Sequence, residues 1–201
     1  ARGHLRGPRG AVPICEDTWA EEPEEYEHVV EGPAETGAEI LVVPNGSPSA
    51  RDKNDLRLSI AVARVTESGL PLVYLNQIGG QDELVFDGAS FVLNADRSVG
   101  AQLPTLREAV AVTEWRREAG GWRCIVGPIA KADENEKTDY GACVLGLRDD
   151  VDKSGFQGVV PGVSGGGGSA RCAALAVGAP GPGRVRGVSA PVRLPPPASP
   201  L

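Results

Sequence analysis

Two short segments of this chain have residue types that could do chemistry. In the first, the apolar run 11–14 ends in Cys15 and acidic residues follow at once, as is typical of a nucleophile at the end of a strand. In the second, at 162–170, four consecutive glycines follow an apolar stretch and precede an Ala-rich one, as in a phosphate-binding loop. A chain with both segments is expected to couple two chemical steps.

Cys15 has the surroundings that activate a thiol. A cysteine at a strand-to-helix turn is exposed, and the free backbone N–H groups that follow it lower the thiol pKa and can hold an oxyanion. Such a thiolate attacks an amide carbonyl and forms a thioester. From these residues alone, a buried structural cysteine stays an open alternative.

The glycine run allows two interpretations. Val159 and Val160 precede it and an apparent helix over 169–177 follows it, so its backbone N–H groups could face a phosphate. Within this run no lysine stands before Ser169, as the Walker pattern would require, and the GxGxxG fingerprint fits poorly. A flexible linker is the alternative.

Composition excludes several classes of function. The 201 residues carry a net charge of −7 with a pI near 4.9, which argues against nucleic-acid binding. No apolar run reaches 18 residues, so no membrane span is predicted. Four widely spaced cysteines and two histidines predict neither a zinc site nor a disulfide scaffold, hence no metal site and a reducing, cytoplasmic setting. Because the chain has no methionine, we expect it to begin inside a longer protein.

Periodicity and turn residues predict an α/β fold. Expected strands cover 10–14, 38–43, 70–76 and 122–126. Expected helices cover 26–30, 52–67, 140–151 and 169–177, the second with Leu56, Ile60, Ala63 and Val65 as its apolar face. Asp87-Gly88 predicts a hairpin between 84–86 and 89–93, Gly79-Gly80 a chain break, and the polar segment 131–139 a linker.

Three stretches give the chain a resemblance to a known family. Residues 12–19 resemble the nucleophile segment of the nitrilase-type glutaminase domain in glutamine-dependent NAD synthetases. The resemblance continues through 37–48 and is strongest over 69–91, where the string from Gly79 to Gly88 is not shared by other nitrilase relatives. It implies part of a nitrilase-like αββα sandwich, followed by the first βα unit of a doubly wound adenine-nucleotide alpha-hydrolase-like domain and a disordered C-terminal tail.

The resemblance also assigns glutaminase residues. Cys15 stands where the family has its nucleophile, and Ser47 and Lys53 stand where it has glutamine-binding residues. A hydroxyl can bond the amino-acid end of glutamine and a cation can pair with its carboxylate. Alone, Ser47 would be a turn residue and Lys53 a solvated helix start. The family's triad adds a glutamate base and a lysine before the cysteine, and the fourteen residues before Cys15 contain neither.

The glycine run resembles the ATP-binding loop of the synthetase domain. The implied ATP-binding residues are Gly162, Val163, Ser164, Gly165, Gly166, Gly167, Gly168 and Ser169. The family's usual form is Ser-Gly-Gly-x-Asp-Ser, and Gly168 stands in the place of the aspartate. That departure removes a carboxylate that could serve Mg²⁺.

The resemblance implies an ATP- and Mg²⁺-dependent ligase. Its substrates would be glutamine, deamido-NAD and ATP, and the intact enzyme would be a homo-oligomer in the cytoplasm, without nucleic-acid or membrane partners. We expect a glutaminase part over 1–130, a linker, entry helix and start of the synthetase domain over 131–188, and a disordered tail over 189–201. Two alternatives stay open, a stand-alone carbon–nitrogen hydrolase and a catalytically dead fragment.

Overall fold

The structure is a computed structural model that describes residues 2–4, 7–19, 37–131 and 135–189. Its strands are β1 (Arg2–His4), β2 (Arg9–Ala11), β3 (Ile40–Asn45), β4 (Leu72–Asn76), β5 (Ile78–Gln81), β6 (Leu84–Asp87), β7 (Phe91–Leu93), β8 (Val99–Gln102), β9 (Glu114–Glu118) and β10 (Gly121–Val126). Its helical segments are the 3-10 turns η1 (Cys15–Thr18) and η2 (Pro182–Arg184) and the helices α2 (Lys53–Ser68), α3 (Asn135–Lys153) and α4 (Gly167–Gly178). The chain is thus α/β, as predicted.

A six-stranded mixed sheet forms the body of the molecule, in the order β1-β2-β3-β4-β7-β8. The strands β2, β3 and β4 run parallel to one another, while the other neighbours pair antiparallel. Since the carboxyl ends of parallel strands meet at one edge of a sheet, the segments that follow β2, β3 and β4 are brought together there. These segments contain Cys15, Ser47 and Gln77.

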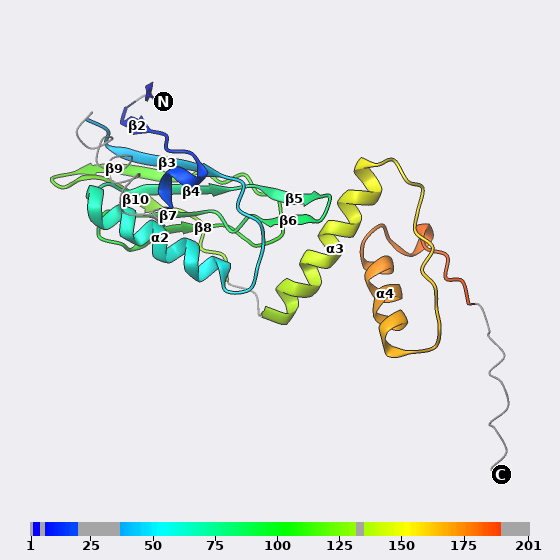
Figure 1. Ribbon diagram of the computed structural model, residues 1–201. Helices are drawn as coiled ribbons and strands as arrows, with labels where there is room; N and C mark the ends of the chain where they lie inside the picture. The colour runs from blue at the N-terminus through cyan, green and yellow to red at the C-terminus, as the bar shows by residue number, and fades with distance from the viewer. Residues whose placement is uncertain (1, 5–6, 20–36, 132–134, 190–201) are drawn as a thin grey trace, which may run out of the picture.

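Helix α2 covers one face of this sheet (Figure 1). Its buried residues are Arg57, Ala61 and Val65, which recur every four positions and pack toward Leu41, Val43, Leu72 and Tyr74 of β3 and β4. The predicted apolar face is confirmed at Val65, which is fully buried, but at its start it is displaced by one residue, because Leu56 is 45% exposed and Arg57 takes the core-facing place. The predicted helix end is confirmed, since Gly69 closes α2 with a left-handed φ of 66°.

The hairpin predicted across Asp87-Gly88 is wrong. Strand β6 ends at Asp87 and pairs with β5, so the tight turn lies at 82–83 and Gly79-Gly80 are strand residues. Positive φ at Gly88 (69°) and Ala89 (53°) instead carries the chain into β7 of the large sheet. The side chain of Asp87 is held by Arg57, which ties this corner to the helix.

Helix α3 packs on the β5–β6 hairpin and lies between the sheet and α4 (Figure 1). A Cβ on Gly80 would come within 2.8 Å of Gly146 Cα, so the strand and the helix approach through two glycines. Asp149 Oδ2 accepts a bond from the Gly80 N–H at 2.8 Å, and Lys153 Nζ donates to the Gly80 carbonyl. Because α3 begins at Asn135, the charged residues 135–139 belong to the helix and not to a linker.

Two sequence predictions fall beyond what is described. The helix expected over 26–30 and residues 190–201 of the tail expected over 189–201 lie outside the described residues. Within the described residues, no helix has the length and apolar character needed to cross a membrane.

Candidate functional site

Cys15 opens the short turn η1 at the edge of the sheet where β2 ends. The expected strand over 10–14 stops at Ala11, since Pro13 has no N–H for a ladder. Cys15 has a φ of 48°, a left-handed conformation that is uncommon outside glycine and that clusters at functional sites. The turn is closed by Thr18 Oγ1, which donates to the Cys15 carbonyl at 2.8 Å, and by the Ile14 N–H, which donates to Asp17 Oδ2 at 2.7 Å.

Ser47 follows β3 and is almost fully buried. Its N–H donates to Asn76 Oδ1 at 2.9 Å, and its carbonyl accepts from Arg57 Nη2 at 2.8 Å. Its Oγ accepts from Arg57 Nε at 3.0 Å. Ser47 is therefore held in place at three atoms, which is more than a surface turn residue requires.

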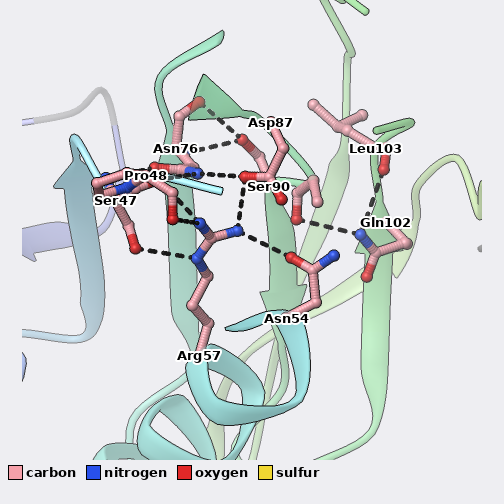
Figure 2. Close-up of polar contacts among 10 residues, drawn as sticks. Ser47, Pro48, Asn54, Arg57, Asn76, Asp87, Ser90, Gln102 and Leu103 are labelled. Atoms are coloured by element: carbon pink, nitrogen blue, oxygen red, sulfur yellow. Dashed lines mark hydrogen bonds and ion pairs between the residues drawn. The ribbon is translucent and has the colours of Figure 1, made fainter. Parts of the chain in front are cut away.

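Arg57 is the centre of this network, and sequence reasoning missed it. The side chain is 2% exposed and pairs with Asp87 Oδ1 at 2.8 Å, where Asp87 is equally buried (Figure 2). Asn76 Nδ2 reaches the same carboxylate oxygen at 3.3 Å. The available signal was spacing, because Arg57 stands in line with Ala61 and Val65 on the buried stripe of α2.

Lys53 begins α2, one helical turn before Arg57. Its Nζ lies 4.3 Å from the ring centroid of Trp19, the residue that follows η1. Such a contact attracts a cation to the face of the ring and links the start of α2 to the Cys15 turn. Lys53 is half-buried and is not the fully solvated helix start of the alternative interpretation.

Tyr74, on β4, lies close to the same edge. Its ring stacks on Phe91 with centroids 4.8 Å apart, and it is 3% exposed. Burial raises the pKa of the Tyr74 phenol above its ordinary value, while Arg57 and a hydrogen bond with Ser47 lower it and Cys15 raises it further. The phenol oxygen makes no hydrogen bond of full geometry among the described residues, but Ser47 lies within reach of it and can serve as its partner.

The structure thus brings Cys15, Ser47 and Lys53 to one edge of the sheet, with Tyr74 and Arg57 beneath them. The other three cysteines lie elsewhere. Cys124 is buried and its Sγ contacts the carbonyls of Gly100 and Val126, whereas Cys143 and Cys172 are exposed on α3 and α4. Within the described residues, no group of three or more His, Cys, Asp or Glu could hold a metal ion.

The glycine run is divided between a loop and a helix. Residues 162–166 form the loop, Gly166 is the N-cap of α4, and Gly167, Gly168 and Ser169 are its first turn. Ser169 Oγ donates to the Gly166 carbonyl at 2.9 Å and accepts from the Ser164 N–H at 3.2 Å. Gly168 is not a capping residue, so an aspartate there would act through its charge and not as an N-cap.

The backbone N–H groups of the loop could bind a phosphate, but the loop and the first turn of α4 offer no carboxylate to a metal ion. The first N–H groups of a helix have no intrahelical acceptor, and the helix dipole favours an anion beside them. A Cβ at Gly165, Gly167 or Gly168 would meet nothing within 4 Å, so the backbone is open. The first turn of α4 contains no acidic residue, and a magnesium ion would find no carboxylate there.

Comparisons with known proteins agree on one group of relatives. A family model described as NAD synthase matches residues 140–199. The glutamine-dependent NAD(+) synthetase of Rhodobacter capsulatus is 50% identical over 182 residues, which are 90% of this chain and 32% of that protein. The corresponding synthetase of Xanthomonas campestris is 38% identical over 192 residues, covering 94% of this chain and 33% of the relative.

A solved structure extends the likeness to the fold. The glutamine-dependent NAD+ synthetase from Acinetobacter baumannii in complex with adenosine diphosphate superposes with a TM-score of 0.83 at 34% identity, over 95% of this chain and 35% of that one. The chain therefore spans about a third of the length of the relatives it matches.

Proposed function

We propose that this chain takes part in the amidation of deamido-NAD. It belongs to the glutamine-dependent NAD(+) synthetase family, and it spans about a third of the length of the relatives it matches. Ammonia would be released from glutamine at Cys15, and ATP would activate the carboxylate that receives it. The enzyme is a ligase in this proposal, and we place it in the cytoplasm as a homo-oligomer.

The proposal divides the chain into two working parts. Residues 1–130 would belong to the αββα sandwich of the glutaminase, and residues 131–188 would hold the linker, the entry helix and the first βα unit of the doubly wound synthetase domain. The observation that carries the proposal is the meeting of Cys15, Ser47 and Lys53 at one edge of the sheet, in a chain that continues into a phosphate-type loop.

Cys15 would supply the nucleophile of the first reaction. The glutamate base that the resemblance implies would take the thiol proton, the thiolate would attack the side-chain carbonyl carbon of glutamine, and the C–N bond would break as the base returns that proton to the leaving ammonia. Water would then hydrolyse the thioester to glutamate and restore the thiol. Ser47 and Lys53 would bind the amino-acid end of glutamine. The glutamate base and the lysine that the resemblance implies before Cys15 are not among residues 1–14.

The loop before α4 would bind the phosphates of ATP through backbone N–H groups. In the second reaction ATP adenylates the carboxylate of deamido-NAD, and ammonia displaces AMP. Mg²⁺ accompanies ATP in this proposal, but the loop and the first turn of α4 offer it no carboxylate, so we derive no step through the metal. An ADP-bound relative supports nucleotide use.

A chimaera tests the proposal. This chain would replace the matching 182-residue segment of the Rhodobacter capsulatus relative, and glutamate formation from glutamine would be measured. Cys15→Ala should lower the rate by more than about 10³-fold, because the nucleophile is lost. The exposed Cys143→Ala is the matched control and should leave the rate unchanged.

Labelling adds a direct readout. A glutamine-analogue electrophile should modify Cys15 and leave Cys124, Cys143 and Cys172 unmodified, and mass spectrometry maps the adduct. The substrate shape of the reagent matters, because Cys143 and Cys172 are more exposed than Cys15 and would react with a general thiol reagent. An adduct at another cysteine, or glutamate formation that survives Cys15→Ala, contradicts the proposed function.

A further inference from the structure

Asn45 is the last residue of β3, and one end of its side-chain amide has no partner. The residue is 8% exposed, and its Nδ2 donates to the Val43 carbonyl at 2.8 Å. Because a carbonyl can only accept, this bond fixes which end of the amide is the N–H2 group. Asn45 Oδ1 is buried and accepts no hydrogen bond from any residue that the structure describes. Buried side-chain oxygens are normally satisfied, so this acceptor is available to a donor group of a ligand.

The asparagine on the next strand is different. Asn76 pairs with Asn45 in the register of β3 and β4, and both ends of its amide are in use (Figure 2). Its Oδ1 accepts from the Ser47 N–H at 2.9 Å, and its Nδ2 reaches the Ser47 carbonyl at 3.2 Å and Asp87 Oδ1 at 3.3 Å. Asn76 thus holds the end of β3 in place, whereas Asn45 Oδ1 has no such structural role.

Asn45 is also level with the candidate nucleophile. Strands β2 and β3 run parallel with Ala11 opposite Leu41, and four residues further along the two segments stand Cys15 and Asn45. The turn η1, which begins at Cys15, packs against β3. Since parallel strands end at one edge of a sheet, the thiol and the open amide oxygen belong to the same edge.

The two groups share one face of the sheet as well. Side chains alternate along a strand, so the buried Asn45 lies on the same face as Val43, which packs in the core cluster with Tyr74. Burial, and to a smaller extent Cys15, raises the pKa of the Tyr74 phenol, so the thiol acts on this face. Asn45 Oδ1 is therefore an open acceptor at the place where the thiol would meet its substrate.

The side-chain amide of glutamine has the matching donor. The carbon that Cys15 would attack carries an N–H2 group, which offers two hydrogens. This nitrogen is bonded directly to the attacked carbon, so it must lie close to the thiol. In the proposed function the amino-acid end of glutamine lies on the side of Ser47 and Lys53. The donor that comes nearest to Asn45 is thus the amide nitrogen.

We propose that Asn45 is a catalytic residue whose Oδ1 accepts a hydrogen bond from the side-chain N–H2 of glutamine and holds this nitrogen as ammonia leaves. The inference rests on the proposed function and deepens it, because it explains how the site selects an amide. An ester of the same shape has an oxygen in this place, which has no hydrogen to donate and would face Oδ1 acceptor to acceptor. Asn45 moves no proton, and that task stays with the base.

The test compares substrates that differ in one group. In the chimaera, kcat/KM would be measured for glutamine, for glutamate γ-methyl ester, which lacks the amide N–H2, and for glutaramic acid, which lacks the α-ammonium. Asn45→Leu is close in size and has no acceptor. It should reduce the preference for glutamine over the ester by about three- to tenfold, the value of one hydrogen bond. The preference for glutamine over glutaramic acid should not change, because both have the amide.

Asn94 provides the matched control. It is also buried, but its Oδ1 accepts from the Cys124 N–H at 2.8 Å, and its Nδ2 donates to Ser98 Oγ and to the Cys124 carbonyl. Asn94→Leu should therefore leave the preference for glutamine over the ester unchanged. In urea unfolding of the chimaera it should lower stability more than Asn45→Leu, which removes one hydrogen bond and an oxygen without a partner.

The outcomes separate this inference from the proposed function. If Asn45→Leu lowers kcat/KM for amide and ester by one common factor, or leaves both unchanged, the amide contact is overturned and the glutaminase assignment stands. A loss of preference for glutamine over glutaramic acid alone would instead assign Oδ1 to the ammonium group and also overturn it. If Asn45→Leu does not fold, the smaller Asn45→Ser decides by the same ratio. If the unmutated chimaera forms no glutamate and the unaltered relative does, the proposed function itself fails.

Discussion

The candidate sites of the sheet body and of the C-terminal segment differ in how their residues are held. Of the nineteen buried apolar side chains in the described residues, fifteen lie between Ala11 and Cys124 and only four after residue 135. In the body, Ser47 is held by side chains from α2 and β4. In the loop before α4, Ser164 and Ser169 bond to each other, Ser169 bonds to Gly166, and the Val163 N–H donates to the Val188 carbonyl. A ligand at the first candidate site would meet side chains already held in place, whereas one at the second would meet exposed backbone.

The largest effect should come from breaking the buried pair in the body. Arg57→Leu leaves the Asp87 carboxylate almost fully buried without its partner, so the free energy of unfolding should fall by about 3–5 kcal/mol. The control is Arg51→Leu, whose pair with Asp139 is as short but has side chains 75% and 45% exposed, and which should cost about 0–1 kcal/mol. Urea unfolding measures both. Equal losses would contradict the view that burial sets the cost.

The junction between the two regions should respond next. Gly80→Ala places a methyl group 2.8 Å from Gly146 Cα, where backbone must move, so we expect a loss of about 1–3 kcal/mol and faster hydrogen exchange in α3. Gly167→Ala is the matched control, since a Cβ there meets nothing, and helix propensity should stabilise it by up to about 1 kcal/mol. An α3 whose exchange is unchanged by Gly80→Ala would show that the glycine contact does not hold the helix.

A smaller gain is expected in the exposed loop. Gly168→Asp meets no steric obstacle and puts a negative charge in the first turn of α4. The free energy of unfolding should therefore rise by about 0.5–1 kcal/mol, and this gain should be smaller in high salt. In the chimaera, NAD formation from deamido-NAD, ATP, Mg²⁺ and free ammonia should also rise. Ammonia bypasses the glutaminase reaction. Equal NAD formation by both forms would mean that glycine at this position is harmless.

The smallest change in stability is expected at Tyr74. Tyr74→Phe removes a buried hydroxyl that makes no hydrogen bond of full geometry and keeps the stacked ring, so the free energy of unfolding should stay the same or rise by up to about 1 kcal/mol. Thermal unfolding of the chain, without substrate, measures it. A loss above about 1 kcal/mol would show that the hydroxyl is hydrogen-bonded inside the protein, with Ser47 as the neighbour within reach.

Local sequence patterns predicted individual strands and helices well but poorly predicted which strands pair. The strands over 38–43 and 70–76 and the helix closed by Gly69 are confirmed, because apolar periodicity and a C-terminal glycine are local signals. The Asp87-Gly88 hairpin failed because strand pairing depends on distant contacts. Strand β6 pairs with β5, and the aspartate that suggested a turn is used to hold Arg57.

The sequence predicted the candidate site residues but not the residues that hold them in place. Cys15, Ser47 and Lys53 came from a family resemblance, and their roles stay predictions. Arg57 was missed because a charged residue on an amphipathic helix is ordinarily solvated, and only the structure shows that it faces the core. Tyr74 is an ordinary strand residue in sequence, and its place within reach of Ser47 is a property of the packed structure alone.

The contact between α3 and the β5–β6 hairpin also affects whether a strand of another molecule can pair with this hairpin. A two-stranded ribbon has free edges, and an edge with unpaired N–H and C=O groups is a template for a strand of another molecule. In β5, the N–H and carbonyl of Gly80 are not left free, because Asp149 and Lys153 occupy them. Two side chains of one helix thus occupy the pairing groups of Gly80, so a strand of another molecule cannot pair with β5 at that residue.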